Sequence, residues 1–261
     1  MIQLNNENYH SIAANEAYWS VSQFKAFNKC EAAGLAEAMG QYVRDETDAL
    51  LIGKYVDAAL AGSEAEVRRF VNANGDKMFK KNGELLAKFS HANEIIARVQ
   101  RSDLMMNYLE GEKQVIFTGE LFGLPWKCKA DVFNGSRIVD LKCVKDFAEI
   151  FEPGYGWRSW VEYWGYDIQG AIYQRIIEQN TGKKLPFYIA AVTKEKTPDI
   201  TVLEIPQHVL DAAYRLVEAK IETFDLVKTG EVEPLRCEKC DYCKETKVLT
   251  APELYEIKEA E

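Results

Sequence analysis

The chain has 261 residues, of which 47% are hydrophobic and 28% are charged, a composition that excludes disordered, collagen-like and coiled-coil proteins. No apolar run reaches the ~20 residues of a membrane span, and the first residues lack the basic start and apolar core of a signal peptide, so we expect a cytoplasmic protein without a membrane partner. The net charge of −9 argues against a protein that coats nucleic acid nonspecifically, but it is compatible with an enzyme that gathers carboxylates around metal ions.

The first half of the chain carries helical patterns after a polar, partly irregular lead-in of 19 residues. Ser20 and Gln23 have the spacing of a capping box, which marks the start of a helix. Apolar periodicity predicts helices at residues 22–30, 48–60, 63–73 and 82–109, with a turn at 72–76.

The second half mixes strands and helices. Strands are predicted at residues 114–118, 124–133, 137–143, 187–192 and 200–205, and helices at 159–180 and 206–228. Asn134-Gly135 predicts a tight hairpin turn, and Gly182 is expected to end the first of these helices. This order predicts an α/β (α+β) fold with a central mixed β-sheet flanked by helices.

Charged side chains alternate along the second and third strands. Asp140 and Lys142 share one face of a strand, and Asp131 shares a face with Lys127 and Lys129 on the strand before it. The hairpin would bring Asp131 close to Asp140 and Lys142. Two carboxylates that hold Mg²⁺, with a lysine that orients water or offsets phosphate charge, suit metal-assisted hydrolysis of a phosphodiester. An exposed hairpin with ordinary alternating charges remains the alternative.

Other residues add to this pattern. Gln169 and Tyr173 lie one turn apart on the helix after the third strand, where they could support a metal site or belong to an ordinary amphipathic helix. Residues 155–160 are aromatic and basic, and they could stack on a base or pack on one another. The histidines are scattered and no glycine-rich phosphate loop occurs, which argues against a catalytic triad, an ATPase and a Rossmann enzyme.

Six cysteines divide into two groups. Cys128 and Cys143 fall on predicted strands, where we expect them to be small buried residues. Cys237, Cys240 and Cys243 form a C-x2-C-x2-C run, which predicts a bound metal or an iron–sulfur cluster because disulfides are rare in the cytosol.

Asp131, Asp140-Leu141-Lys142 and Gln169-x3-Tyr173, in this order, resemble the motifs of the PD-(D/E)xK nuclease superfamily in its RecB-like branch. The closest resemblance is to the RecE-type (exonuclease VIII-like) nucleases of phages and prophages. It implies a restriction-endonuclease-like fold. The implied organisation is a single nuclease domain over residues 1–261, with a helical part at about 20–110, a catalytic core at about 111–228 and a cysteine-rich tail at about 229–261.

The resemblance assigns roles to individual residues. Asp131 and Asp140 would bind the metal together with the backbone carbonyl of Leu141. Lys142 would be the catalytic lysine, and Gln169 and Tyr173 would complete the catalytic set as the Q-x3-Y motif.

The chain departs from the family at one position. RecB-like nucleases often carry a metal-binding histidine four residues after an early glycine, whereas here Gly53 is followed by Asp57. Aspartate is a good ligand for Mg²⁺, so Asp57 is a candidate ligand, with an exposed helix charge as the alternative. Glu112 and Glu120 are weaker candidates for an additional metal ligand or for an acid that supports the ligands.

The cysteines carry a second resemblance. In the AddB type and in a CRISPR-associated type of RecB-like nuclease, a [4Fe-4S] cluster joins one cysteine before the nuclease core to three after it. Cys30, Cys237, Cys240 and Cys243 follow this order, although their last gap is shorter. A [4Fe-4S] cluster, a tetrahedral Zn²⁺ ion and an empty thiol cluster all remain open, and either metal would be structural.

The resemblance also implies a function. The expected activity is a Mg²⁺-dependent (or Mn²⁺-dependent) exonuclease in a bacterial or phage-infected cell, which resects linear duplex DNA from 5′ ends for a single-strand annealing recombination protein. A homo-oligomer is expected by analogy with processive relatives. Lys127, Lys129, Lys145 and Arg158 are the candidates for phosphate contacts. The alternatives are a nuclease for single strands or flaps, and a relative that binds DNA or a protein without cutting.

Overall fold

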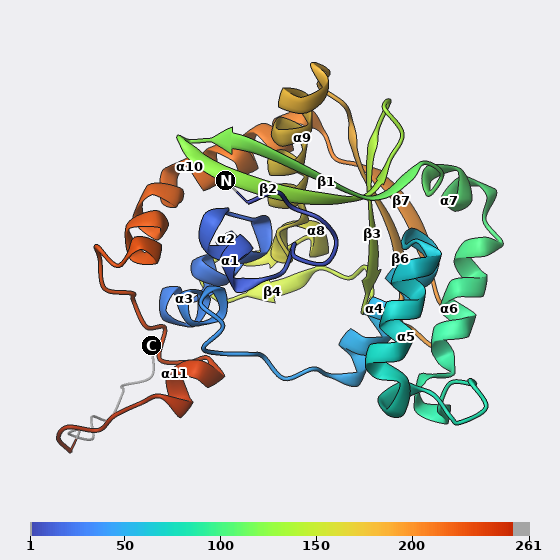
Figure 1. Ribbon diagram of the computed structural model, residues 1–261, viewed down its shortest axis with the longest axis horizontal. Coiled ribbons are helices and arrows are strands. Elements are labelled where there is room, and N and C mark those ends of the chain that lie inside the picture. The colour runs from blue at the N-terminus through green and yellow to red at the C-terminus, as the bar shows by residue number, and fades with distance from the viewer. Residues whose placement is uncertain (1, 253–261) are drawn as a thin grey trace.

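The computed structural model describes residues 2–252, and its centre is a five-stranded mixed sheet (Figure 1). The strand order is β1-β2-β3-β6-β7. All neighbours pair antiparallel except β3 and β6, which are parallel. The strands are β1 (Glu112–Leu121), β2 (Leu124–Phe133), β3 (Ile138–Val144), β6 (Phe187–Thr193) and β7 (Ile200–Glu204). This arrangement confirms the predicted α/β (α+β) fold with a central mixed sheet flanked by helices.

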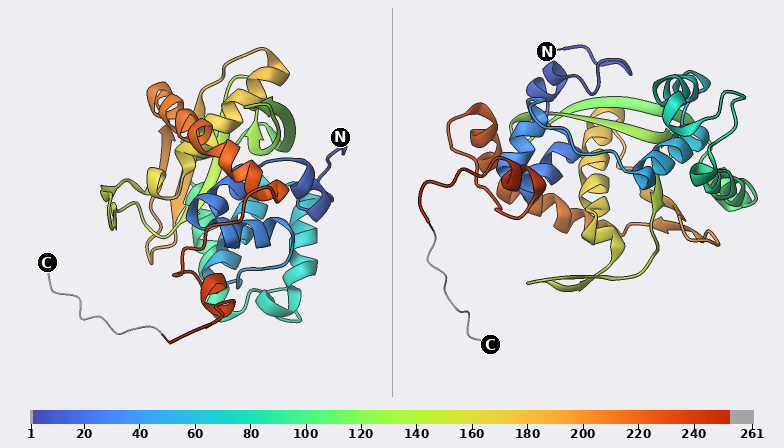
Figure 2. Two further views of the ribbon diagram at one scale, coloured as in Figure 1. Left: turned by 90° about the vertical axis from the view of Figure 1, so that its left-hand side faces the viewer. Right: turned by 90° about the horizontal axis from the view of Figure 1, so that it is seen from below.

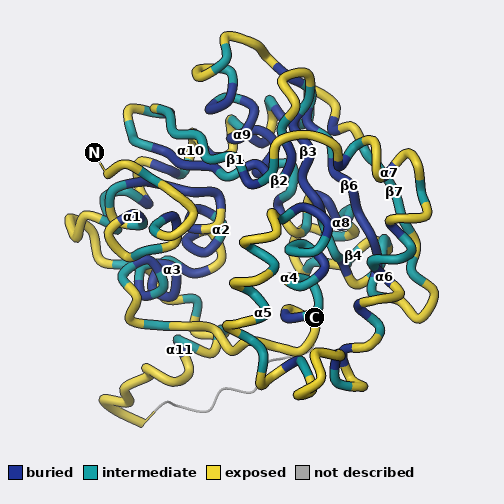
Figure 3. Tube along the Cα trace, turned by 45° about the vertical axis from the view of Figure 1, so that its right-hand side comes forward, coloured by how far each residue is buried: buried dark blue, intermediate teal, exposed yellow. Residues whose placement is uncertain are grey.

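Helices cover both faces of the sheet. On one face α9 (Tyr166–Thr181) contacts β1, β2 and β6, and α10 (Gln207–Thr229) packs on α9. On the other face α4 (Asp48–Ala61) contacts β3 and α6 (His91–Gln100) contacts β6. Because side chains alternate along a strand, β3 sends Ile138 into the first core and Val139 and Leu141 into the second. Strands β3 and β6 are therefore buried along most of their length (Figure 3).

Smaller elements surround these layers. They are α1 (Ile12–Ala17), α2 (Val21–Lys29), α3 (Glu31–Ala38), α5 (Glu64–Met78), a 3-10 helix η1 (Ala87–Phe89), α7 (Asp103–Tyr108), β4 (Ile150–Glu152), β5 (Gly156–Arg158), α8 (Trp160–Tyr163) and α11 (Asp241–Glu245). The antiparallel β4–β5 hairpin is a separate two-stranded sheet that projects from the body of the molecule (Figure 2). Near the C-terminal end, α11 contacts α3. No helix within residues 2–252 is long and apolar enough to cross a bilayer.

The N-terminal part agrees with one prediction and corrects another. The lead-in is partly irregular, as predicted, with α1 inside it, and Trp19 donates its backbone N–H to the carbonyl of Pro125 at the edge of the sheet. The predicted turn at 72–76 lies inside α5, which begins with a capping box formed by Ser63 and Glu66 and continues to Met78. Burial of Met78 in the core outweighs the ~1 kcal/mol by which a glycine disfavours a helix interior.

Two predicted long helices are broken. The helix predicted at 82–109 is η1, α6 and α7, and the Ser102 hydroxyl caps the last of these by accepting from the N–H of Met105. The helix predicted at 159–180 divides into α8 and α9 at Gly165, whose φ of +63° a helix cannot contain. Half of residues 155–160 form β5, which pairs with β4, and the aromatic side chains of this region contact one another and Arg158, as in the Phe151–Trp157 and Tyr155–Arg158 contacts.

Candidate active site and cysteine cluster

The central motif residues gather where β2 and β3 separate. The two strands pair only at Val132–Val139 and Phe133–Ile138, next to the hairpin turn. Asp131 and Asp140 are the first residues beyond the last pair, one on each side of the resulting fork. Strand β3 keeps its pairing with β6 throughout, so only its edge toward β2 is left open. The fork therefore exposes backbone groups of β3 beside two carboxylates.

The side chain of Asp131 replaces the β2 backbone as the hydrogen-bond partner of β3 at Leu141. Its Oδ2 accepts a hydrogen bond from the backbone N–H of Leu141 at 3.0 Å. Because the N–H and C=O of one strand residue point to the same side, the carbonyl of Leu141 also faces the fork. The side chain of Leu141 lies in the core on the α4 side. The predicted ligand set of two carboxylates and a carbonyl thus converges at one place.

Gln114 is a site residue that the sequence did not indicate. It lies between the Lys113–Val132 and Val115–Ala130 pairs of β1 and β2, which puts it across from Asp131, and its side-chain amide donates to Asp131 Oδ1 at 3.1 Å. Its φ of +52° lies in the left-handed region, which costs a non-glycine residue of order 1 kcal/mol and persists only where the surroundings impose it. Its position opposite Asp131 was the one available indication, and only a known register reveals it.

Asp140 is held from two sides. Its side chain is 2% exposed, and Gln169 on α9 donates its amide to Oδ1 at 2.5 Å. Lys142 forms an ion pair with Oδ2, an oxygen that no hydrogen bond of ordinary geometry reaches. Tyr173 lies one turn after Gln169, and its ring packs against Phe187 at the start of β6. It therefore helps to hold α9 against the sheet.

Three carboxylates share this region. Burial, followed by the charges of Asp140 and Asp57, raises the pKa of Asp131 well above its ordinary value. Burial also raises the pKa of Asp57 to about 6; Lys142 opposes this effect and Asp140 adds to it. Asp57 reaches the site from α4, which packs on β3. Like charges that raise one another's pKa provide the electrostatic setting of a divalent-cation site.

Two lysines flank the aromatic ring of Tyr166. Burial alone would lower the pKa of Lys142, but Asp140 and Asp131 outweigh it and raise the pKa, so this lysine is protonated. Lys25 on α2 has its pKa lowered to about 8, first by burial and then by Lys142. The two ammonium groups lie 5.0 Å and 5.3 Å from the ring centroid. Lys25 could not be predicted as a site residue from the sequence, because only tertiary packing brings α2 to the fork.

Two of the lysines predicted to contact phosphate, Lys127 and Lys129, lie in different surroundings. Lys127 is 1% exposed, and its ammonium donates to the carbonyl of Tyr9 at 2.6 Å and to Asn15 Oδ1 at 2.9 Å. This burial contradicts the prediction that Lys127 contacts DNA, because the N-terminal segment covers that part of β2. Lys129 is half-buried, with its ammonium group 5.5 Å from the centroid of the Tyr9 ring, and its charge opposes the raised pKa of Asp57.

The remaining charged candidates lie at the margin. Lys145 is 93% exposed in its side chain and pairs with Asp146. Arg158 pairs with Glu152 within the β4–β5 hairpin, at 2.6 Å. Glu120 lies beside the β1–β2 turn, at the end of β1 away from the fork, and Glu112 begins β1 on the surface.

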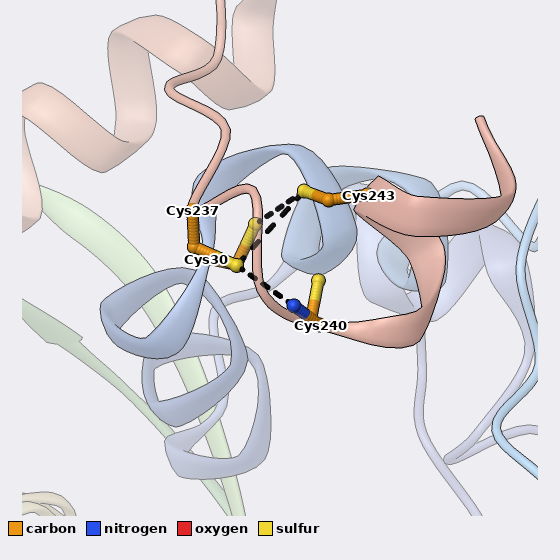
Figure 4. A group of neighbouring side chains, drawn as sticks. All are labelled: Cys30, Cys237, Cys240 and Cys243. Carbon is orange, nitrogen blue, oxygen red and sulfur yellow. Dashed lines mark hydrogen bonds between the residues drawn. The ribbon is translucent and has the colours of Figure 1, made fainter. Parts of the chain in front are cut away.

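The four predicted cysteines meet at a second location (Figure 4). The Sγ atoms of Cys30, Cys237, Cys240 and Cys243 all lie within 4.8 Å of one another. Among the described His, Cys, Asp and Glu side chains, this is the one group of three or more that converges so closely. Cys128 is buried in one core of the sheet, as predicted, whereas Cys143 is half-buried and packs against the other core.

The comparisons with known proteins agree with this geometry. Residues 20–246 match the family described as a PDDEXK-like domain of unknown function (DUF3799). The crystal structure of a candidate exonuclease from Eubacterium rectale is similar, with a TM-score of 0.91 and 43% identity over 97% of each chain. No curated protein matches. The family match includes the fork and all four clustered cysteines, and the chain therefore belongs to this PDDEXK-like family, with its restriction-endonuclease-like fold.

Proposed function

We propose that this chain is a metal-dependent DNA exonuclease that resects linear duplex DNA from its 5′ ends. The observation that carries the proposal is the fork, where Asp131, Asp140 and Lys142 meet beside an unpaired backbone carbonyl. The family membership and the likeness to a candidate exonuclease support hydrolysis of nucleic acid from ends. The 5′ polarity rests on the RecE-type resemblance of the motifs.

The residues of the fork fit a divalent cation. Asp57, Asp131, Asp140 and the carbonyl of Leu141 are hard oxygen donors of the kind that Mg²⁺ or Mn²⁺ prefers. Asp140 Oδ2 accepts no hydrogen bond besides its ion pair with Lys142, and burial together with the neighbouring carboxylates raises the pKa of Asp57 and Asp131 although Lys142 opposes this. A divalent cation would relieve the remaining repulsion among the three carboxylates. When bound there, the ion would polarise the scissile phosphate and lower the pKa of a water molecule.

The side chains around the fork have separate tasks. The N–H of Leu141 and the amide of Gln114 fix both oxygens of Asp131, so this carboxylate is oriented before substrate arrives. Gln169 orients Asp140 in the same way. The protonated Lys142 supplies a positive charge, with a proton at Nζ, next to the place where a phosphate would bind, and Lys25 adds a second charge across Tyr166.

Two consequences for partners follow from the proposed activity. Resection from 5′ ends leaves a 3′ single strand, which is the substrate of a single-strand annealing recombination protein. We also propose that the protein works as a homo-oligomer, by analogy with relatives that digest processively, and sedimentation of the full chain with and without DNA would test this.

The experiment is a digestion assay with Mg²⁺ on four substrates: linear duplex labelled at the 5′ or the 3′ end, closed circular duplex and linear single strand. We expect 5′ labels to be released first and circles to be spared. Asp140→Asn should lower the rate by at least ~100-fold, whereas Asp76→Asn, which changes an exposed aspartate of α5, should leave it unchanged. Preferential digestion of single strands would favour the flap-nuclease alternative. Failure of the folded protein to cut with Mg²⁺ or Mn²⁺ would refute the proposal.

A further inference from the structure

The spacing of the four clustered sulfur atoms distinguishes between possible metal centres. The Sγ atoms of Cys30 and Cys243 are 3.6 Å apart, and those of Cys237 and Cys243 are 3.9 Å apart. These distances are far too long for a disulfide, in which sulfur atoms lie ~2 Å apart. Tetrahedral Zn²⁺ with Zn–S bonds of ~2.3 Å would place its sulfur ligands ~3.8 Å apart. A [4Fe-4S] cluster inserts a cube of iron and sulfide between its thiolates and would hold them roughly 6 Å apart.

We infer that Cys30, Cys237, Cys240 and Cys243 bind a single tetrahedral Zn²⁺ ion, which attaches the C-terminal segment to the N-terminal helices. This ion is distinct from the cation proposed at the fork: its ligands are soft thiolates, and the set of four is closed, which is typical of a structural rather than a catalytic zinc site.

The backbone around the tail cysteines is shaped to present sulfur to one point. The N–H of Cys240 donates to Cys237 Sγ at 3.3 Å, a bond that stabilises a thiolate. Glu238, inside this turn, has a φ of +56°, a left-handed conformation that the surrounding contacts must impose. Cys240 then precedes the short helix α11, which carries Cys243 back toward the cluster.

The fourth ligand comes from more than 200 residues away in the sequence. Cys30 separates α2 from α3, and its extended backbone turns the side chain toward the tail. Two backbone contacts align the segments: the N–H of Ala32 donates to Leu235 O at 3.1 Å, and the N–H of Leu235 donates to Glu31 Oε2 at 2.8 Å. Cys30 and Cys243 are buried, so an ion bound there would be shielded on two sides.

Nearby charges suit the centre. Four thiolates and one Zn²⁺ carry two net negative charges, which require cations or N–H donors around them. Arg236 lies next to the first tail cysteine, and its guanidinium donates to the carbonyl of Cys243 at 2.7 Å. Lys239 and Lys244 also belong to this segment. Arg236 and Lys244 also pair with the tail carboxylates Glu238 and Asp241, so the hydrogen bond from Arg236 to Cys243 is the contact that brings a positive charge to the cysteines.

The first test is the metal content of the full chain. Cells would be supplied with both zinc and iron, and the protein would be purified once under argon and once in air. We expect one zinc per chain in both preparations, no acid-labile sulfide and no visible absorption. About four iron atoms with four sulfides in the argon preparation would overturn the inference in favour of a cluster, and metal-free protein would overturn it in favour of free thiols.

Variants and cobalt exchange complete the test. Cys237→Ser should reduce bound zinc at least ~10-fold, because a three-thiolate site is open. The matched Cys143→Ser, outside the cluster, should keep one zinc. If Cys237→Ser does not fold, Co²⁺ exchanged into the wild-type chain provides an independent readout, since a tetrahedral tetrathiolate site gives intense visible bands and a six-coordinate oxygen site does not. Weak bands alone would contradict the inference, whether or not the protein cuts DNA.

Discussion

Replacing Asp57 with asparagine tests the position at which the sequence departs from the RecB-like motif pattern that it otherwise resembles. Burial, opposed by Lys142 and reinforced by Asp140, raises the pKa of Asp57 from its ordinary 3.8 to about 6. The folded state therefore holds the proton more tightly than the unfolded state. Stability from this group is present at low pH and is lost as the pH rises from about 4 to about 6. The difference corresponds to at most about 3 kcal/mol above pH 6 in the metal-free protein.

The assay is urea unfolding of the wild type and Asp57→Asn in EDTA, at pH 4 and at pH 8. At pH 8 the variant should be the more stable, by roughly 1–3 kcal/mol, because it carries no buried charge. At pH 4 the difference should fall below about 1 kcal/mol, since Asp57 is then protonated in the folded wild type. Adding Mg²⁺ at pH 8 should reverse the order, because only the wild type would offer this carboxylate to the ion.

A matched control separates this effect from a general one. Asp76→Asn changes an exposed aspartate of α5 and should alter stability by less than ~0.5 kcal/mol at either pH. Equal stability of Asp57→Asn and wild type at pH 8 in EDTA, together with equal stabilisation of both by Mg²⁺, would show that Asp57 is an ordinary helix charge.

Three further substitutions test other parts of the structure. Gly170→Ala should lower the free energy of unfolding by roughly 1–3 kcal/mol, measured by thermal melting, because a Cβ there would lie 2.5 Å from the Phe187 ring. Lys25→Met should lower kcat/KM for DNA about 10-fold with a melting temperature no lower than that of the wild type, because it removes a buried charge, and a loss of activity that merely followed lost stability would contradict its role at the site. Trp157→Ala removes a side chain that is 68% exposed on the β4–β5 hairpin. If this hairpin stacks on bases, fluorescence anisotropy in an inactive background should show single-stranded DNA binding weakened by ~1–3 kcal/mol.

Local patterns predicted the sheet and the centre of the site. Side-chain alternation placed Asp140 and Lys142 on one strand face, and the hairpin turn after Phe133 brought Asp131 to the same fork. These inferences succeed because strand period and short turns depend on neighbouring residues alone. The three tail cysteines could likewise be predicted as a group, because their spacing depends on neighbouring residues alone. Their meeting with Cys30 could be proposed only through the resemblance.

Long-range packing decided what the sequence could not show. Lys127 and Lys129 look equivalent in the strand pattern, yet the N-terminal segment buries the first and leaves the second near Asp57. Gln114 became a site residue through a left-handed backbone that no propensity favours for glutamine. Tertiary contacts also extend α5 beyond the Asn74-Gly75 pair that was expected to end it. Burial of Met78 stabilises the helix by more free energy than the glycine costs it.

Helix α2 connects the two candidate metal sites. One end of it meets Cys30 in the sulfur cluster, and Lys25, little more than one turn earlier, reaches Tyr166 and Lys142 beside the fork. The C-terminal segment contacts the helical layer largely through Leu235, Glu31 and the cysteines. An ion that fixed this segment would therefore also fix the end of the helix that positions Lys25. A metal bound by the cysteines would thus be linked to the proposed active site through α2 and Lys25, without contact to substrate or the reacting atoms.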